Sequence, residues 1–421
     1  MSEASLLHPF RQRVLRWPAM KKRSSSLLLP AVLGLLAIAT PGYGVETSWT
    51  GATDVVWNKS GNWNNGIPGA TGTDAQNTDI AIFRTEAGTS TVSLTDSNRN
   101  IGGIRFNAQA DDDITITLSG NLRLQGNIVV EAGSTGRHRI ATDGATAERL
   151  LRLGATSEEA GVYAYSIVNN STALFTVDPK IDSSGGGSTV RTRNLTLGGS
   201  GDLLLTGGIS GAQAQYPINI IKEGSGTATL AKATGSTYGT TTVNAGTLLL
   251  TNTSGSGTGA GAVLVGSAGK IGGSGRIETT AGLTLEGTLI AGLTATDTFR
   301  LKGNTTFVEG SRIQLTLGPD GAASSLTREG GNWSFSATQS VEFVFLPGAA
   351  AGLYSDLITG LAADPGVASW TVANAGWNGQ FQWSGGNVSV LLTAIPEPST
   401  LWLAGLAVGI GLLLHRRRAL S

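Results

Sequence analysis

Cysteine is absent from the 421-residue chain, and histidine occurs only three times, as His8, His138 and His415. Without cysteine there is no disulfide framework, no thiolate nucleophile and no cysteine-based zinc site. His8 and His415 lie in the terminal segments, so a histidine-based triad or a multi-histidine metal site within one chain is excluded. His138 stands between two arginines after a glycine-rich turn, and we expect it to be a surface residue. We expect neither a metal nor another cofactor.

Charge is also scarce, because charged residues make up 14% of the chain, against about 25% in an average soluble domain. Six of the 29 basic residues precede Glu46 and three follow Ala394. The segment between them has 20 basic and 27 acidic residues, a net charge of −7. An acidic body argues against nucleic acid as a partner, since proteins that bind nucleic acid neutralise its phosphates with clustered lysine and arginine.

Long stretches of helical periodicity are missing from the body of the chain, and glycine is abundant at 61 residues. From Trp49 onward, short apolar or alternating runs are separated by Gly, Asn, Asp and Ser, for example "ITITLSG", "LRLQGNIVV", "TTVNAGTLLLT" and "LTLEGTLIAG". Each run has the length and alternation of one β-strand. Only "TAERLLRLGATSEEAG" around Leu150 leaves room for one short helix. The chain is therefore predicted to be all-β.

Many short strands with glycine-rich corners favour a right-handed parallel β-helix, or solenoid, in which each coil buries its apolar face against its neighbours. We assign residues 45–325 to this solenoid. With about 20 residues per coil, Trp49 to Gly318 would form on the order of thirteen coils. Residues 326–394 contain more aromatic residues and strict alternation, which predicts a small antiparallel β cap.

The N-terminus has the arrangement of a secretory signal peptide. Basic residues 21–23 precede an apolar run over residues 27–39, and Gly44 provides a small residue before a cleavage site. This apolar run is shorter than the ~20 residues that a membrane-spanning helix needs. We therefore expect residues 1–44 to be a signal peptide, with Met20 as the more typical start, and we expect signal peptidase and the general secretion machinery as partners.

The C-terminus combines a short apolar segment with a cluster of arginines. Ser399 to Leu414 is uncharged, and as a helix it would span about 24 Å against a hydrocarbon core of ~30 Å. Arg416, Arg417 and Arg418 follow and would keep that end cytoplasmic. We expect a transmembrane helix that halts translocation and holds the body across the inner membrane.

Before this segment stand Pro396, Glu397 and Pro398, whose prolines favour an extended peptide. The order of Pro-Glu-Pro, apolar helix and arginine cluster, over residues 395–421, resembles the PEP-CTERM sorting signal of Gram-negative bacteria that make extracellular polysaccharide. The resemblance implies recognition by an exosortase, an integral-membrane cysteine protease or transpeptidase, with release or transfer of the body outward. An ordinary tail anchor with an incidental Pro-Glu-Pro is the alternative.

A second resemblance lies in "KEGSGTATLAKATGSTYGTTTVNAGTLLLTN", residues 222–252. This segment resembles the autotransporter-associated β-strand repeat, which implies a passenger-like β-helix. The matching positions are Lys222, Gly224, Gly226, Thr227, Leu230, Tyr238, Thr242, Val243, Asn244, Gly246, Thr247 and Leu248. The segment departs from the repeat at "TYGTTT", where the family usually has another residue between Tyr and Gly. Because the sorting tail occupies the C-terminus, we do not expect self-transport. Alternation places Val243, Leu248 and Leu250 toward the interior.

Acidic residues are the candidates for chemistry. Asp111, Asp112 and Asp113 form the densest acidic run, and β-helix polysaccharide lyases use clustered carboxylates with calcium. Consecutive aspartates before a strand are more typical of a solvated turn, because neighbours on a strand point to opposite faces. Glu158 and Glu159 have the same interpretation. We therefore assign no catalytic residue and no metal site.

Three tryptophans near the start of the body, Trp49, Trp57 and Trp63, could stack on sugar rings. Packing in an N-terminal cap is favoured for them, because tryptophan buries well wherever its N–H finds a partner.

Together these patterns predict a non-enzymatic structural or adhesive protein that is exported and held transiently in the inner membrane. It would then reach the cell surface or the exopolysaccharide matrix of a Gram-negative biofilm, with exopolysaccharide as a candidate partner. The alternative is a β-helix carbohydrate-active enzyme, or a carbohydrate-binding protein, that acts on extracellular polysaccharide.

Overall fold

The computed structural model describes residues 44–72, 76–84, 91–183, 189–211 and 215–396. Regular structure in these residues is almost entirely β, which confirms the prediction of an all-β chain. Helical structure in the described ranges is confined to three short 3-10 segments, η1 Ser60–Asn62, η3 Pro319–Gly321 and η4 Val367–Ser369. The short helix that the sequence allowed around Leu150 is not formed, because Leu150–Leu153 is strand β11.

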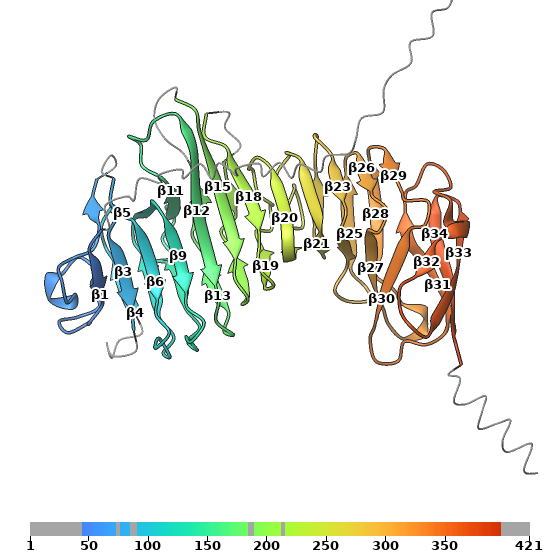
Figure 1. Ribbon diagram of the computed structural model, residues 1–421, viewed down its shortest axis with the longest axis horizontal. Coiled ribbons are helices and arrows are strands. Elements are labelled where there is room, and N and C mark those ends of the chain that lie inside the picture. Colours follow the sequence, from blue (N-terminus) through green and yellow to red (C-terminus); the bar gives the residue numbers. More distant parts are fainter. Residues whose placement is uncertain (1–43, 73–75, 85–90, 184–188, 212–214, 397–421) are drawn as a thin grey trace, which may run out of the picture. The chain divides into compact units, whose positions relative to one another are not determined.

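Successive coils pair mainly in parallel and build three ladders of strands. The first ladder begins near the N-terminus of the described chain. Figure 1 shows β3, β6, β9 and β12 side by side in chain order. The first ladder contains β1 Glu46–Ser48, β3 Ile80–Phe83, β6 Gly103–Phe106, β9 Asn127–Val130, β12 Gly161–Asn169, β15 Arg191–Gly198, β18 Ile218–Lys222, β20 Thr241–Leu250, β21 Val263–Gly273, β23 Leu283–Leu285, β26 Thr305–Phe307 and β29 Trp333–Ser334.

The second ladder runs beside the first and shares two of its strands. It contains β4 Thr91–Leu94, β7 Thr115–Leu118, β10 Arg139–Thr142, β13 Phe175–Val177, β16 Leu203–Leu205, β19 Thr227–Leu230, β20, β21, β24 Thr288–Ala291, β27 Arg312–Leu317, β30 Ser340–Phe345 and β32 Thr371–Val372. Because β20 and β21 are long enough to pair in both ladders, the two ladders form one 22-stranded sheet.

The third ladder consists of two separate six-stranded sheets. One contains β2 Ala70–Thr71, β5 Asn98–Ile101, β8 Asn121–Leu124, β11, β14 Lys180–Asp182 and β17 Ile209–Ser210. The other contains β22 Arg276–Glu278, β25 Thr298–Lys302, β28 Ser325–Gly330, β31 Gly352–Thr359, β34 Asn387–Ala394 and β33 Trp377–Ser384.

Coil length follows from the register of the parallel pairs. Val263 pairs with Leu283 and Leu283 with Thr305, so coils in this part take 20 to 22 residues. The longest step is from Ile128 to Ile167, which is 39 residues. Coils without an inserted loop therefore have the expected length of about 20 residues. The right-handed winding of the solenoid stays a prediction.

Apolar columns fill the interior of the solenoid, because the same inward position recurs in each coil. One column in the second ladder joins Phe175, Leu203, Ala228, Leu248, Ile271, Leu289, Ile313 and Val341, and each of these residues is at most 2% exposed. Complete burial of a side chain of this size stabilises the fold by about 1.5–3 kcal/mol. Val243, Leu248 and Leu250 are fully buried, so the predicted alternation in β20 is confirmed.

Antiparallel pairing is found at both ends of the third ladder, where β2 pairs with β5 near the N-terminus and β34 lies near the C-terminus. β34 pairs antiparallel with both β31 and β33. Parallel pairing nevertheless continues beyond residue 325, because β30 pairs in parallel with β27 and β32. The antiparallel strands therefore end the third ladder while the second ladder still winds as a solenoid.

Close contact between coils makes some glycines irreplaceable, and Gly246 in β20 is the clearest case. Its φ is +66°, and an added Cβ would lie 2.3 Å from the Gly224 carbonyl oxygen and 2.8 Å from Lys222 Nζ. A Gly246→Ala variant should lose about 2 kcal/mol or more of unfolding free energy, from backbone strain and the clash. The midpoint of urea unfolding measures this loss.

Gly266 in β21 is the matched control, because its added Cβ would meet no atom closer than 3.6 Å. Gly266→Ala should leave the midpoint within the range of ordinary surface substitutions, about 0.5 kcal/mol. Equal effects of the two substitutions would contradict the proposed close packing at Gly246.

Candidate functional site

The sorting motif begins where the last strand of the body ends. Ala394 closes β34 and pairs with Trp377 of β33. The next N–H, that of Ile395, donates to the Gly376 carbonyl at 2.8 Å. Pro396 is exposed. The Pro-Glu-Pro motif therefore follows the antiparallel cap directly.

The rest of the predicted tail lies outside the described residues. This applies to Glu397 and Pro398, to the apolar segment from Ser399 to Leu414, and to Arg416, Arg417 and Arg418. The predicted signal peptide, residues 1–44, also lies outside them except for Gly44, and it stays a prediction. No helix in the described part of the chain is long and apolar enough to cross a membrane. The transmembrane helix and its arginine stop stay predictions.

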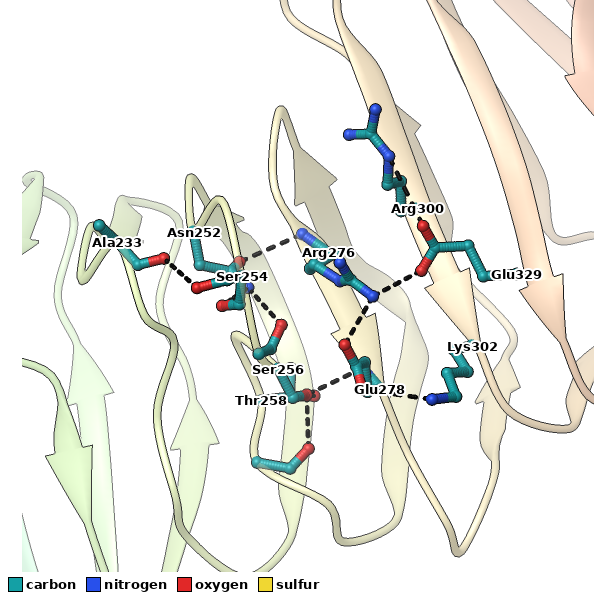
Figure 2. A network of polar contacts seen from close by, with 12 residues as sticks. Ala233, Asn252, Ser254, Ser256, Thr258, Arg276, Glu278, Arg300, Lys302 and Glu329 are labelled. Atoms are coloured by element: carbon teal, nitrogen blue, oxygen red, sulfur yellow. Dashed lines mark hydrogen bonds and ion pairs between the residues drawn. The ribbon is translucent and has the colours of Figure 1, made fainter.

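A network of ion pairs covers the outer face of β22, β25 and β28 (Figure 2). The Arg276 guanidinium donates to Glu329 at 2.7 Å and lies 2.6 Å from a Glu278 carboxylate oxygen. Arg300 lies 3.6 Å from Glu329, and Lys302 lies 3.7 Å from Glu278. Both carboxylates therefore have two cationic partners each, and at least one partner of each carboxylate comes from another coil.

This network joins strands of different coils. Arg276 and Arg300 occupy the same register position in adjacent strands, where two like charges would repel each other. Glu329 neutralises both of them. Pairs that are partly exposed contribute little individually, about 0–1 kcal/mol. The main effect of the arrangement is therefore that Glu329 offsets the repulsion between Arg276 and Arg300.

A hollow of about 540 Å³ lies at the corner between the first and second ladders. Lys270, Thr288 and Arg312 occupy one register position in three successive coils, so the short Thr288 leaves space between two long cations. Glu286 and Glu309 also line the hollow. In the described residues, Lys270 and both glutamates form no side-chain ion pair, unlike the charges of Figure 2. Sequence analysis did not single out these residues, because three coils contribute them.

Lys222 was identified from the repeat resemblance, and it occupies an unusual position in the core. It replaces an apolar residue in the column between Leu197 and Val243, and it is 1% exposed. Its ammonium donates to the carbonyls of Glu223 at 2.7 Å, Gly224 at 3.0 Å and Ala245 at 3.3 Å. Burial lowers the pKa of Lys222 to about 8, although the carboxylates of Asp202 and Glu223 oppose the shift. Lys222 therefore ties two coils together from inside.

A Lys222→Met variant keeps the length of the side chain and removes the ammonium. We expect it to lose about 2 kcal/mol of unfolding free energy, because the carbonyls lose a donor inside the protein. Urea unfolding measures the change, and Lys270→Met, at an exposed lysine, is the control. A Lys222→Met variant as stable as the wild type would show that the ammonium contributes nothing net to the fold.

His138 is buried, so its prediction as a surface residue is wrong. It is 1% exposed, and its ring stacks on Phe106 with centroids 4.4 Å apart. Nδ1 accepts the Ile114 N–H at 3.4 Å, and Nε2 lies 2.7 Å from the Ser134 hydroxyl, which donates to the Ala110 carbonyl. The flanking arginines are exposed, whereas His138, directly before β10, is buried between its partners from the preceding coil and Ser134. His138 is therefore part of the packed interior.

The protonation of His138 should make stability depend on pH. Burial lowers the pKa of His138 from 6.5 to about 4, while Asp113 and a backbone hydrogen bond at Ala110 oppose the shift. The unfolded chain thus takes up a proton near pH 6.5, and the folded chain only near pH 4. Stability contributed by this residue is present at pH 7 and falls by up to about 3 kcal/mol as the pH drops from 6.5 to 4.

Thermal unfolding of the full chain at pH 7 and pH 5 measures this loss. A His138→Asn variant retains an acceptor near the Nδ1 position but cannot take up the proton. It should be less stable at pH 7 and should lose less stability on acidification than the wild type. The same loss in both proteins would contradict a buried neutral histidine.

Glu158 was also expected in a solvated turn, and this is wrong. It is 7% exposed and accepts from Arg193 at 2.9 Å and from the Tyr165 hydroxyl at 2.8 Å. The Ala155 N–H donates to the same carboxylate at 3.1 Å. Glu159 is exposed, as expected. The Glu158 carboxylate is thus part of an internal ion pair between coils.

Asp111, Asp112 and Asp113 are exposed, as the sequence predicted for a turn. Asp111 accepts a hydrogen bond from Thr135 at 3.1 Å, and Asp113 accepts one from the Arg137 N–H at 2.7 Å. These bonds join the turn to the corresponding turn of the next coil. Within the described residues, no group of three or more His, Asp or Glu side chains could hold a metal ion.

The three N-terminal tryptophans close the first coil, as favoured from the sequence. Trp49, Trp57 and Trp63 are at most 5% exposed and pack on one another and on Phe83. The indole N–H of Trp57 donates to the Pro68 carbonyl at 3.2 Å, and that of Trp63 to the Trp57 carbonyl at 2.7 Å. Buried rings cannot stack on sugars, so carbohydrate binding by these tryptophans is excluded.

A comparison with protein families finds the PEP-CTERM protein-sorting motif over residues 394–418. The match includes the Pro-Glu-Pro residues and the three arginines, and it confirms the resemblance of the tail. It implies processing by an exosortase-type enzyme and a protein that is exported toward the cell surface. No curated protein and no solved structure matches the chain. The resemblance of residues 222–252 to the autotransporter-associated repeat stays a prediction.

Proposed function

We propose that this chain is a non-enzymatic structural or adhesive solenoid displayed at the cell surface or in the exopolysaccharide matrix. The observation that carries the proposal is the sorting motif at residues 394–418, which follows a stacked β-solenoid without a spacer. Under this proposal, residues 1–44 direct secretion. The apolar segment before Arg416 holds the chain in the inner membrane until the processing enzyme acts on Pro396, Glu397 and Pro398.

Three carboxylates of the body are held in ion pairs, which supports a structural role for these three residues. A general acid or base needs a carboxyl group that can reach substrate and exchange a proton. Glu158 is held by Arg193, and Glu278 and Glu329 are held by Arg276. The repeat resemblance of residues 222–252 adds support, because it implies a passenger-like surface domain.

Sorting is tested by expressing the full chain together with an exosortase-type enzyme and measuring the intact mass of the protein recovered outside the cell. We expect a mass reduced at both ends. Glu397→Ala should leave the chain cell-associated with its tail intact, because the recognised peptide is altered. Asp112→Ala, in an exposed turn of the body far from the motif in sequence, is the control and should be exported and processed like the wild type.

Two results would contradict the proposal. One is a wild-type chain that stays intact in the cytoplasm, which would exclude export. The other is an extracellular Glu397→Ala protein with the same mass as the processed wild type, which would show that Pro-Glu-Pro does not direct processing.

A further inference from the structure

A pocket of about 340 Å³ lies where the first ladder ends. β29 pairs only with β26 in the described structure, so no further strand of this ladder covers its residues. The loop from Leu361 to Pro365, after β31, contributes to the lining instead. The first ladder ends at β29, whereas the second ladder continues from β30 to β32. The pocket lies where this additional strand of the first ladder is missing. Its volume is within the range of about 300–1,000 Å³ found for small-ligand sites.

Two aromatic rings form part of the apolar lining, and Leu361, Ala362, Ala363 and Pro365 form the rest. Trp333 and Phe335 both line the pocket and are only partly buried. Phe335 stacks on Phe307 with centroids 4.6 Å apart and an interplanar angle of 4°, and it packs against Trp370 at 5.1 Å. These contacts hold the rings in place, so the aromatic surface is present before any ligand arrives.

Arg328 forms the cationic side of the rim and is also held in place. Its Nε donates to the Gly331 carbonyl at 2.9 Å, and its Nη1 donates to the Gly360 carbonyl at 2.9 Å, while Nη2 also donates to Gly331. Gly331 precedes β29 and Gly360 follows β31, so the guanidinium joins both walls of the pocket. Three of its five N–H groups serve the protein, and two remain for a ligand.

Asp364 and Asn332 complete the polar rim. One oxygen of Asp364 accepts the N–H groups of Gly366 at 2.9 Å and Val367 at 3.3 Å, which fixes the carboxylate. Its other oxygen can accept from a ligand. Asn332 is exposed, and its side-chain amide forms no hydrogen bond within the described ranges, whereas its backbone N–H donates to Asn304 Oδ1 at 2.9 Å. One cation, one carboxylate and one amide therefore surround an aromatic surface.

We propose that this pocket binds a neutral sugar unit of an extracellular polysaccharide. A pyranose has an apolar C–H face that packs on aromatic rings, and hydroxyl groups that both donate and accept hydrogen bonds. Such hydroxyls match the guanidinium, the amide and the carboxylate together. A fully apolar ligand would desolvate Arg328 and Asp364 without compensation. A charged ligand would gain from one of these two residues and be repelled by the other.

That the ligand is an extracellular polysaccharide rests on the proposed location of the protein at the cell surface. Sugar binding is tested independently of sorting. Purified full-length chain in detergent micelles is titrated by calorimetry with neutral gluco-, manno- and galacto-oligosaccharides of two to six units. A uronic acid oligosaccharide series is the charged comparison. The wild type should bind at least one neutral series with a Kd below about 1 mM.

Two substitutions remove polar contacts at low risk to the fold. Asn332→Ala shortens an exposed side chain that forms no bond within the described residues, and Asp364→Asn retains the oxygen that accepts the Gly366 and Val367 N–H groups. Each should weaken binding about tenfold, as expected for one lost hydrogen bond to a sugar hydroxyl. Lys270→Ala in the charged hollow is the matched control and should bind like the wild type. Thermal unfolding confirms that each variant is folded.

Three results would overturn the proposal. They are no binding of any neutral oligosaccharide by the folded wild type, binding of the uronic series alone, and loss of binding in Lys270→Ala with Asn332→Ala and Asp364→Asn unaffected. The last result would place the saccharide in the hollow. A protein that binds sugar but is not processed would contradict the proposed function alone, and a processed protein that does not bind would contradict only this inference.

Discussion

Stacking of identical inward positions from coil to coil is the interaction on which the rest of the structure depends. A single coil presents only one or two apolar side chains per strand and cannot bury them alone. Parallel pairing aligns the coils so that each apolar side chain lies on the corresponding one before it, as in the column from Phe175 to Val341. With no cysteine in the chain, this repetition replaces covalent cross-links.

The same register governs the polar groups. Because each position recurs in every coil, a charge on one strand lies beside the corresponding residue of the next strand. Arg276 and Arg300 are an example, and Glu329 compensates for both. Lys222 shows the internal counterpart, since its ammonium replaces an apolar residue in a column and bonds to carbonyls of two coils. Aromatic side chains pack on one another at two places where the stacking ends, around Trp57 in the first coil and around Trp333 at the end of the first ladder.

Much of the fold was predictable because strand alternation and glycine-rich turns are local signals. Val243 and Leu250 face the interior as the pattern required. The same local reasoning failed for His138 and Glu158, which were assigned to the surface from their polar neighbours. Both are buried because partners from other coils satisfy them, Ile114 for His138 and Arg193 for Glu158. These partners lie 24 and 35 residues away in sequence, and nothing in the local pattern indicates them.

The all-β class and the sorting motif could be recognised in the sequence, because both depend on short-range order: alternation within a strand, and Pro-Glu-Pro before an apolar segment and arginines. Which polar residues are available to a ligand depends instead on the packing of the coils. The charged side chains in Figure 2 form ion pairs with one another, whereas the pocket beside Trp333 has polar groups that a ligand can reach. That difference arises from coil register and from where the ladders end, and residues of several coils contribute to each.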